Sequence, residues 1–441
     1  MKNTPSSLFT TAVAAALVVL GSVSAPAQPA AAPTALKFSF APGAAAPGFT
    51  SVPPDQTYSK ASGFGFEPGA ALKAVDEGGA GAAPGGFVTS EKGFYFSANV
   101  PEGNYKVTVT LGDAKGESVT TVKAELRRLM LEQVRTEPGK FETRTFIVNV
   151  RVPQYPGGQV KLKSPRETTQ EAWGWDNRLT LEFSNSRPCL RSIEITKVDD
   201  VPTVFILGDS TVCDQSGEPF CSWGQMLTRF FKPEVAVANH AESGETVASS
   251  AGAGRLKKVL SLMKPGDYLL MQYGHNDMKN TTAAAYGSLL KSWVAQVQAK
   301  GGIPVLITPM NRHTFQGDVV TNSLKDFPDA VRTLAAEQKV ALIDLNAMSK
   351  TLYEALGPQG SINLFEHVGS DLSKFDATHH CNYGAYELAR CIVEGLKANN
   401  LPLAKSLFTD VPAFNPAHPD PVAEFKVPPS SRVTTQTPLG S

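Results

Sequence analysis

The stretch Thr203-Val204-Phe205-Ile206-Leu207-Gly208-Asp209-Ser210-Thr211 decides the fold of the second half of this chain. Its β-branched and apolar residues are followed at once by glycine, which is typical of a short buried strand that ends in a tight turn. More strands of this kind, separated by stretches with helical periodicity, follow along the chain. The predicted strands are 235–238, 268–272, 303–308 and 340–344, and the predicted helices are 223–231, 254–263, 283–299, 329–338 and 383–397. Alternating strands and helices predict an α/β fold in which helices cover both faces of a parallel sheet.

The first half of the chain, from Leu36 to about Val201, has a different pattern. Short runs alternate between polar and apolar residues and are bounded by glycine and proline, as at 93–97, 105–111, 143–150, 179–183 and 192–195. This pattern predicts an antiparallel β-sandwich. Two aromatic residues, Trp173 and Trp175, lie in one of its loops. We expect them to pack this loop against the neighbouring domain, and stacking on a sugar ring is the alternative.

The N-terminus is predicted to be a secretory signal. Lys2 supplies positive charge, Leu8 to Val23 form an apolar core, and Ala25-Pro26-Ala27 resembles a cleavage site. The alternative is a membrane anchor, but the apolar run is short and interrupted by hydroxyl residues. The expected divisions are a signal peptide at 1–27, a linker at 28–35, a β-sandwich at 36–200, an α/β domain at 201–400 and a Pro-rich tail at 401–441. We interpret the tail as an extended strap over the α/β domain with disordered last residues, and the chain is expected to be secreted or periplasmic.

Charge and cysteine content narrow the class of protein. The 441 residues carry 41 Lys+Arg and 41 Asp+Glu, so there is no basic surplus to neutralise phosphates, and nucleic acid is not expected as a partner. Hydrophobic residues make up 42% of the chain, which is enough for a buried core. After signal cleavage no membrane span is expected. Export permits disulfides, and a local bridge between Cys213 and Cys221 is one possibility, with free thiols as the other.

Four segments with reactive side chains follow predicted strands or precede the last helix. In a parallel sheet the carboxyl ends of the strands meet at one edge, where sites form. The segments are Gly208-Asp209-Ser210-Thr211, Ser243-Gly244-Glu245, Gly274-His275-Asn276-Asp277 and Asp376-Ala377-Thr378-His379. A serine on a tight turn is a potential nucleophile, and a histidine oriented by an aspartate can take its proton. A glycine N–H and an asparagine amide are suitable donors to an oxyanion.

Each of these segments also has a structural interpretation. Asp209 is a potential helix cap, Asn276 a turn residue, Asp376 an N-cap of the last helix and His379 a surface residue. These separate interpretations do not explain why all four segments occur in one order.

That order resembles the SGNH (GDSL-like) hydrolases. Further segments narrow the resemblance to the rhamnogalacturonan acetylesterases, namely Trp223-Gly224-Gln225, His240-Ala241-Glu242-Ser243-Gly244 and Tyr383-Gly384-Ala385-Tyr386-Glu387-Leu388-Ala389. The resemblance covers about residues 202–400. It implies a flavodoxin-like three-layer αβα domain that removes O-acetyl groups from pectic or related polysaccharides without a metal or other cofactor. The upstream sandwich resembles the galactose-binding-like accessory domain of larger bacterial members.

The resemblance also implies roles for individual residues. Ser210 is the nucleophile, His379 the base and Asp376 the residue that orients the base. The oxyanion hole is formed by the backbone N–H groups of Ser210 and Gly244 and by the side chain of Asn276. His380 introduces an ambiguity about the base, which the Asp-x-x-His spacing resolves in favour of His379.

Substrate contacts are less defined. Trp223 and His275 are expected at the rim of the site, where they would hold a sugar, and packing is the alternative for Trp223. Arg312 and His313 follow a strand and are candidates for contact with a uronate carboxylate, although a solvated loop is the favoured interpretation. The predicted partner is an acetylated polysaccharide or oligosaccharide of the pectin type. Acetylated xylan, another acetylated glycan or ester, and a non-catalytic carbohydrate-binding function are the alternatives.

Overall fold

The computed structural model describes residues 1–2, 35–78, 85–368 and 371–439. The predicted signal peptide and all but the last residue of the predicted linker therefore lie outside the described residues, apart from Met1 and Lys2. Contacts join the described residues from 35 to 439 into one unit. Among the helices of the described ranges, none combines the length and the apolar character needed to cross a membrane.

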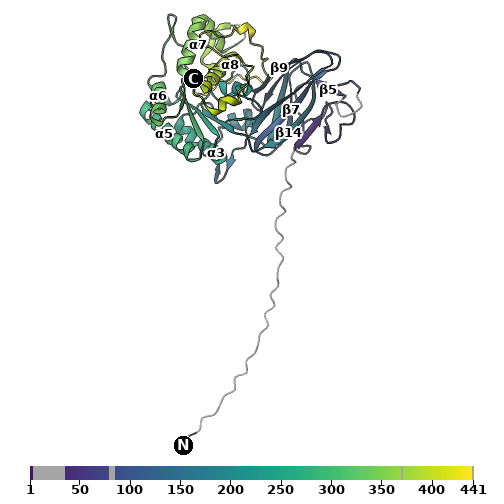
Figure 1. The fold of residues 1–441 in the computed structure, drawn as a ribbon, viewed down its shortest axis with the longest axis horizontal. Helices are drawn as coiled ribbons and strands as arrows, with labels where there is room; N and C mark the ends of the chain where they lie inside the picture. Colours follow the sequence, from purple (N-terminus) through teal and green to yellow (C-terminus); the bar gives the residue numbers. More distant parts are fainter. Residues whose placement is uncertain (3–34, 79–84, 369–370, 440–441) are drawn as a thin grey trace. The chain divides into compact units, whose positions relative to one another are not determined.

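Two stacked sheets form the N-terminal half (Figure 1). The first has the order β10-β7-β14-β1-β2, with β5 beside β14 and β4 beside β5. Its strands are β1 (Ala35–Ser39), β2 (Thr50–Ser51), β4 (Lys73–Asp76), β5 (Gly86–Thr89), β7 (Gly103–Asp113), β10 (Lys140–Val150) and β14 (Leu190–Val198). The second has the order β3-β6-β13-β8-β9, formed by β3 (Phe64–Phe66), β6 (Phe94–Asn99), β13 (Arg178–Arg187), β8 (Ser118–Ala124) and β9 (Arg128–Thr136).

The predicted sandwich is confirmed. The described strand pairs of both sheets are antiparallel apart from β1 with β2. Val107, Val109 and Leu111 alternate along β7 and join one apolar cluster with Phe94 and Phe96 of β6. This alternation is the cause of the pattern in the sequence, because successive side chains of a strand point to opposite faces.

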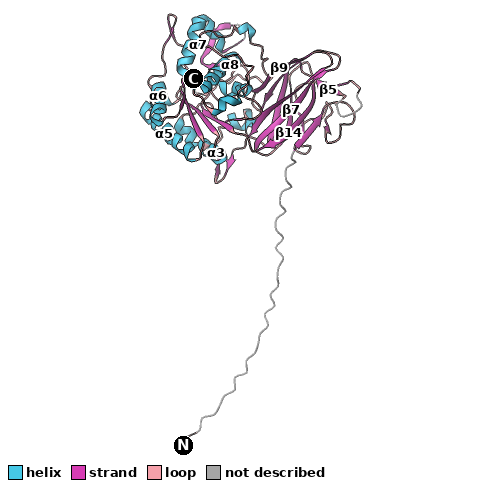
Figure 2. Ribbon diagram, viewed as in Figure 1, coloured by secondary structure: helices cyan, strands magenta, loops and turns pink. Residues whose placement is uncertain are grey.

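The C-terminal half is the predicted parallel sheet with helices around it (Figure 2). Its order is β16-β15-β17-β18-β21, formed by β16 (Ala236–Asn239), β15 (Thr203–Gly208), β17 (Tyr268–Gln272), β18 (Ile303–Ile307) and β21 (Ala341–Ile343). The helices are α1 (Trp223–Leu227), α2 (Val247–Gly252), α3 (Arg255–Leu262), α4 (Asp277–Asn280), α5 (Ala283–Ala299), α6 (Phe327–Gln338), α7 (Leu345–Gly360) and α8 (Asn382–Ala398).

Both faces of this sheet are buried. Val204 and Ile206 of β15 belong to an apolar cluster that includes side chains of α1, α7 and α8. Phe205 and Leu207 of the same strand belong to a second cluster with side chains of α3, α5 and α6. Because both faces are covered, β15 is apolar at every position rather than at every second one. The fold is therefore the three-layer αβα arrangement that was expected.

Short elements complete the chain. Between β10 and β13 lie β11 (Gln154–Tyr155), β12 (Gly158–Gln159), the π-helical turn η1 (Arg166–Gln170) and η2 (Ala172–Gly174). Between α7 and α8 lie η4 (Ser361–Leu364), β22 (Phe365–Val368) and β23 (Asp371–His380). The remaining elements are η3 (Thr228–Phe230), β19 (Phe315–Gln316), β20 (Val319–Val320), η5 (Pro402–Ser406) and η6 (Val422–Glu424).

The tail is an extended strap, as expected from its sequence. Phe425 packs on the rings of Tyr383 and Tyr386 of α8, with ring centroids 5.8 and 5.5 Å apart. Further on, Ser430 Oγ donates to Glu182 in the sandwich. The contacts continue to Leu439, whose N–H donates to Ser243 Oγ at 2.8 Å. The last two residues lie outside the described ranges, so their expected disorder stays a prediction.

Candidate active site

The turn after β15 presents Ser210. The N–H groups of Val212 and Cys213 both donate to Asp209 O, at 3.0 and 3.1 Å, which closes the turn. Gly208 is required at the end of the strand, because a Cβ there would lie 2.6 Å from Val212 Cγ2 and 2.7 Å from Gln272 O. Ser210 is only 1% exposed. The serine is thus held on a rigid turn at the carboxyl edge of the sheet.

The hairpin β22–β23 brings His379 and Asp376 to this serine. His379 Nε2 lies 2.8 Å from Ser210 Oγ, and His379 Nδ1 lies 2.7 Å from Asp376 Oδ2. The other carboxylate oxygen of Asp376 accepts from the N–H groups of Thr378 and His379. With the Nδ1 proton donated to Asp376, Nε2 is left to accept the hydroxyl proton of Ser210.

The electrostatics of Asp376 suit this arrangement. Burial alone would raise its pKa, but hydrogen bonds and charge interaction with His379 hold the pKa of the carboxyl below its ordinary value. The carboxylate is therefore ionised and can stabilise a positively charged imidazole. Asp376 is not the N-cap of α8, because it lies within β23 and the N-cap is Cys381.

His380 occupies a different environment from its neighbour. Its Nε2 atom lies 2.9 Å from the hydroxyl of Tyr353, and its ring packs on Phe365. Burial, together with His379 nearby, lowers the pKa of His380 to about 3. The structure thus brings His379 rather than His380 to the serine.

Gly244 and Asn276 lie on the loops after β16 and β17. Asn276 Nδ2 donates to Glu245 O at 3.1 Å, which ties the two loops together. Gly244 adopts a φ of +73°, which favours glycine. Among the described residues, the N–H groups of Ser210 and Gly244 have no hydrogen-bond acceptor. Two backbone donors and one side-chain amide are therefore available for a developing negative charge.

The neighbouring Asp209 and His275 are structural. His275 Nδ1 lies 3.4 Å from Asp209 Oδ2, and His275 Nε2 lies 3.1 Å from Met310 O. The other oxygen of Asp209 accepts from both the N–H and the hydroxyl of Thr211. Burial alone would raise the pKa of Asp209, but His275 lowers it below its ordinary value. These contacts fix the ends of β15 and β17 relative to each other.

The two expected substrate contacts do not fit the structure. Trp223 and His275 are both 0% exposed. The indole N–H of Trp223 donates to Gln272 Oε1 at 2.8 Å, so the packing alternative is correct for this residue. His275 directs Nε2 to Met310 O and Nδ1 toward Asp209, so both ring nitrogens face buried groups. Neither residue lies at an accessible rim.

Arg312 and His313 have different positions. Arg312 is half-buried, donates to His275 O at 3.3 Å and interacts with the charges of Asp209 and Asp376. The ring of His313 packs on Phe375, and its Nε2 atom hydrogen-bonds with Ser361 Oγ at 3.0 Å, so this residue is structural. A solvated loop therefore describes neither residue.

The possible bridge between Cys213 and Cys221 is absent. All five cysteines of the chain are free, and both of these are buried. Burial raises the pKa of Cys221 to about 12, and it also raises the pKa of Cys213 above its ordinary value. Both side chains therefore behave as small buried apolar groups rather than as a staple.

Trp175 confirms the packing interpretation of its loop. It is 7% exposed, and its ring packs against His240 of the α/β half at 5.8 Å. Arg151 lies over the ring at 4.5 Å. The other tryptophan of this loop, Trp173, is covered by Arg432 of the tail, whose guanidinium lies 4.1 Å from the ring centroid.

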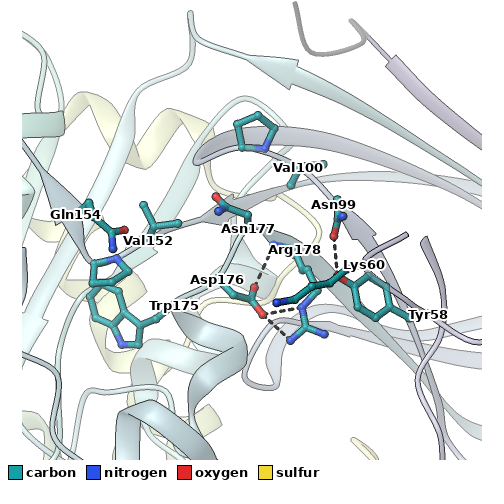
Figure 3. A pocket seen from close by; sticks show the side chains of 12 residues that line it. Tyr58, Lys60, Asn99, Val100, Val152, Gln154, Trp175, Asp176, Asn177 and Arg178 are labelled. Atoms are coloured by element: carbon teal, nitrogen blue, oxygen red, sulfur yellow. Dashed lines mark hydrogen bonds and ion pairs between the residues drawn. The ribbon is translucent and has the colours of Figure 1, made fainter. Parts of the chain in front are cut away.

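A cavity of about 980 Å³ lies elsewhere, and Figure 3 shows the residues that line it. Tyr58 and Arg178 line one part of it, and Gln154 and Trp175 line another. Apart from Trp175, the residues predicted from the sequence as candidates for catalysis or sugar contact are not among those that line it. Arg178 pairs with Asp176, and the Tyr58 hydroxyl donates to Asn99, so much of the polar lining is already satisfied internally.

Several residues at the site were not predicted from sequence. Lys163, Arg166, Gln215 and Leu439 contact the serine turn or the loop of Gly244. Lys163, Arg166 and Leu439 come from the sandwich half or the tail, far from the α/β segment in sequence. No local motif marks them, because tertiary contacts alone bring them to the site.

Comparisons with known proteins match both halves. Residues 206–367 match the GDSL-like lipase/acylhydrolase family, and residues 36–134 match the β-agarase/YXIM esterase-like, galactose-binding domain-like family. Rhamnogalacturonan acetylesterase RhgT of Bacillus subtilis is 37% identical over 216 residues, which are 46% of this chain and 93% of the relative. Uncharacterized esterase YxiM of the same organism is 28% identical over 389 residues, covering 84% of this chain and 93% of the relative. Probable rhamnogalacturonan acetylesterase YesY, also of Bacillus subtilis, is 30% identical over 47% of this chain and 98% of its own length.

Proposed function

Because the chain belongs to the GDSL-like lipase/acylhydrolase family, we propose that it is a serine esterase that removes O-acetyl groups from plant cell-wall polysaccharide of the pectin (rhamnogalacturonan) type. The observation that carries the chemistry is the chain of contacts from Ser210 Oγ to His379 and on to Asp376, at 2.8 and 2.7 Å. The substrate class rests on the relatives RhgT and YesY, whose names give rhamnogalacturonan acetylesterase.

The proposed reaction has two acyl-transfer steps. In the first, His379 Nε2 takes the hydroxyl proton as Ser210 Oγ attacks the acetyl carbonyl carbon. Negative charge develops on the carbonyl oxygen and is stabilised by the N–H groups of Ser210 and Gly244 and by Asn276. The protonated imidazole then gives its proton to the departing sugar oxygen, which leaves an acetyl ester on Ser210.

In the second step, water replaces the sugar. His379 takes a proton from the water as its oxygen attacks the acetyl-enzyme carbonyl, and the same three donors stabilise the charge. The proton returns to Ser210 Oγ as the ester bond breaks, and acetate leaves. Asp376 stays ionised throughout, since its role is to hold the imidazole and to stabilise its charge.

A panel of acetylated polysaccharides tests the substrate. We expect the most free acetate from acetylated rhamnogalacturonan and less from acetylated xylan. The highest rate on xylan, or on an O-acetylated peptidoglycan, would reassign the substrate and leave the esterase chemistry intact. Glycan binding without release of acetate, even from a chromogenic acetate ester, would support the non-catalytic alternative.

The proposal extends to the location of the protein. The residues that support export are Lys2, the apolar run Leu8 to Val23 and the small residues before position 28. We propose that the chain is secreted or periplasmic after cleavage near Ala27. N-terminal sequencing of the protein from its natural host would find a mature start near residue 28, and an uncleaved Met1 would contradict this.

A further inference from the structure

A charged segment of the sandwich half, residues 163–171, contacts the loop that carries Gly244. It includes Lys163, the turn η1 and Glu171, and it follows the hairpin β11–β12. The loop on the other side is residues 242–245, which begins three residues after the end of β16. The two ion pairs between the described residues of the segment and the loop, Lys163 with Glu245 and Arg166 with Glu242, are each buried on at least one side. The segment and the loop therefore form a desolvated polar contact beside the candidate active site.

Arg166 is at the centre of this contact. Its Nε atom donates to Glu242 Oε1 at 3.0 Å, two residues before Gly244. Its Nη2 atom donates to Gln215 Oε1 at 3.0 Å and lies 2.7 Å from Glu171 Oε1. The residue is 8% exposed. One planar guanidinium thus holds three acceptors from three separate parts of the chain.

The contact with Gln215 reaches the nucleophile turn. Because Gln215 Oε1 accepts from Arg166, its Nε2 atom must point the other way, and there it donates to Ser210 O at 2.6 Å. The guanidinium therefore fixes the orientation of this amide. Through Glu242 and Gln215, Arg166 connects the loop of Gly244 with the turn of Ser210.

Lys163 adds a second link to the same loop. Its ammonium donates to Ser243 O and pairs with Glu245 Oε1 at 3.0 Å. The backbone carbonyl of Glu245 accepts the hydrogen bond from Asn276 described above. The sandwich half therefore contacts the loop of Gly244 directly. It reaches the turn of Ser210 through Gln215 and the side chain of Asn276 through Glu245.

The acidic residues of this contact are paired with arginines. The carboxyl groups of Glu167, Glu171 and Glu242 lie within 4.8 Å of one another. Arg166 pairs with two of them, and Arg255 pairs with Glu167 at 2.5 Å. Burial raises the pKa of Glu171 well above its ordinary value, and the negative charge of Glu242 raises this pKa further. Each of the three carboxyl groups thus has a guanidinium partner.

We propose that Arg166 is a positioning residue, which sets the distance between Ser210 and the oxyanion donor of Gly244 and makes the sandwich half part of the catalytic unit. This inference rests on the proposed esterase function. Reacting groups must be held to within fractions of an ångström, and a misplacement of about 1 Å can cost about a hundredfold in rate. A network that spans both segments is the means by which this chain holds that geometry.

The test measures kcat and KM of the full-length chain on a chromogenic acetate ester. Arg166→Ala and Gln215→Met should each lower kcat about ten- to a hundredfold while KM changes less than about threefold. Millimolar guanidinium should partly restore Arg166→Ala, whereas methylammonium at the same concentration should not, because only the planar fork reproduces the contacts. Gln215→Met removes the link to Ser210 without leaving a buried charge unpaired. This variant therefore tests the positioning role on its own if Arg166→Ala does not fold.

Glu102→Gln is the matched control. It removes an ion pair of 2.6 Å to the buried Lys258, which also joins the two halves but touches neither segment. Its kcat should equal that of the unaltered protein even if its thermal stability falls. A kcat of Gln215→Met within about threefold of the unaltered protein, or an equal loss in Glu102→Gln, would overturn the proposal. An unaltered protein that is inactive on the ester would instead refute the proposed function.

Discussion

Replacing Asn276 by alanine tests the oxyanion hole, because it removes one side-chain donor and no charge. The Nδ2 atom carries two hydrogens, and Glu245 O accepts one of them at 3.1 Å. The second hydrogen is left for the oxyanion, and the bond to Glu245 O orients the amide before substrate binds. Loss of one such donor lowers kcat about 10²- to 10³-fold, which corresponds to about 2.7–4 kcal/mol. We expect this loss in Asn276→Ala.

The assay is hydrolysis of a chromogenic acetate ester over a range of concentrations. The loss should be in kcat, with KM nearly unchanged, because the donor acts on charge that develops only in the transition state. Asn399→Ala is the control, since Asn399 Nδ2 also donates to a backbone carbonyl, that of Leu342, at 2.7 Å. It should keep its kcat. An Asn276→Ala variant with unaltered kcat, whether or not its KM rises, would refute this reasoning.

Four further results are expected. Asp376→Asn should lower kcat by about 10⁴-fold at neutral pH, because an amide no longer holds the productive tautomer of His379, and normal activity would contradict this. Burial raises the pKa of Asp277 to about 7, so the folded state binds this proton more tightly than the unfolded chain does and loses stability as pH rises from about 4 to about 7. The Tm of Asp277→Asn should therefore fall less between about pH 5 and about pH 8 than the Tm of the unaltered protein. An equal fall in both proteins would exclude Asp277 as the origin. Deleting residues 436–441 should raise kcat/KM on polymeric substrate, because Leu439 lies against Gly244, and a lower value would show that the tail belongs to the site. Millimolar reductant should leave Tm and kcat unchanged, since all the thiols are free, and a fall in Tm would reveal a disulfide.

The sequence predicted the part of the site that a parallel sheet brings together. Ser210, Gly244 and Asn276 each follow a strand, so a correct reading of the strands was enough to place them at one edge. His379 and Asp376 were found by their spacing. The structure supplies them from the hairpin β22–β23, whereas the alternative interpretation made Asp376 the cap of a helix.

The rest could not be predicted, because it depends on contacts between distant segments. Arg166 has no local motif, and its role follows only from the meeting of η1 with two loops of the α/β half. Trp223 was misplaced for a related reason. An aromatic residue near a nucleophile suggests a sugar contact, but here the indole N–H finds a buried partner in Gln272 and the ring fills the core.

Helix α7 was also missed. Its sequence from Leu345 to Tyr353 has helical periodicity, but Gly357-Pro358 indicates a turn. In the structure the backbone has a φ of +72° at Gly357, where the helix is kinked. The breakers thus mark a real interruption, and the helical part before it was missed although its Leu345, Leu352 and Tyr353 pack in the apolar cluster on the sheet.

Acetate release by the unaltered protein and by Ser210→Ala is the most direct measurement of the central claim. Both should fold alike, because the substitution removes one hydroxyl. On acetylated rhamnogalacturonan, the unaltered protein should release acetate, while Ser210→Ala should release almost none and should carry no acetyl group by mass spectrometry. Equal release of acetate by the two proteins would contradict the account.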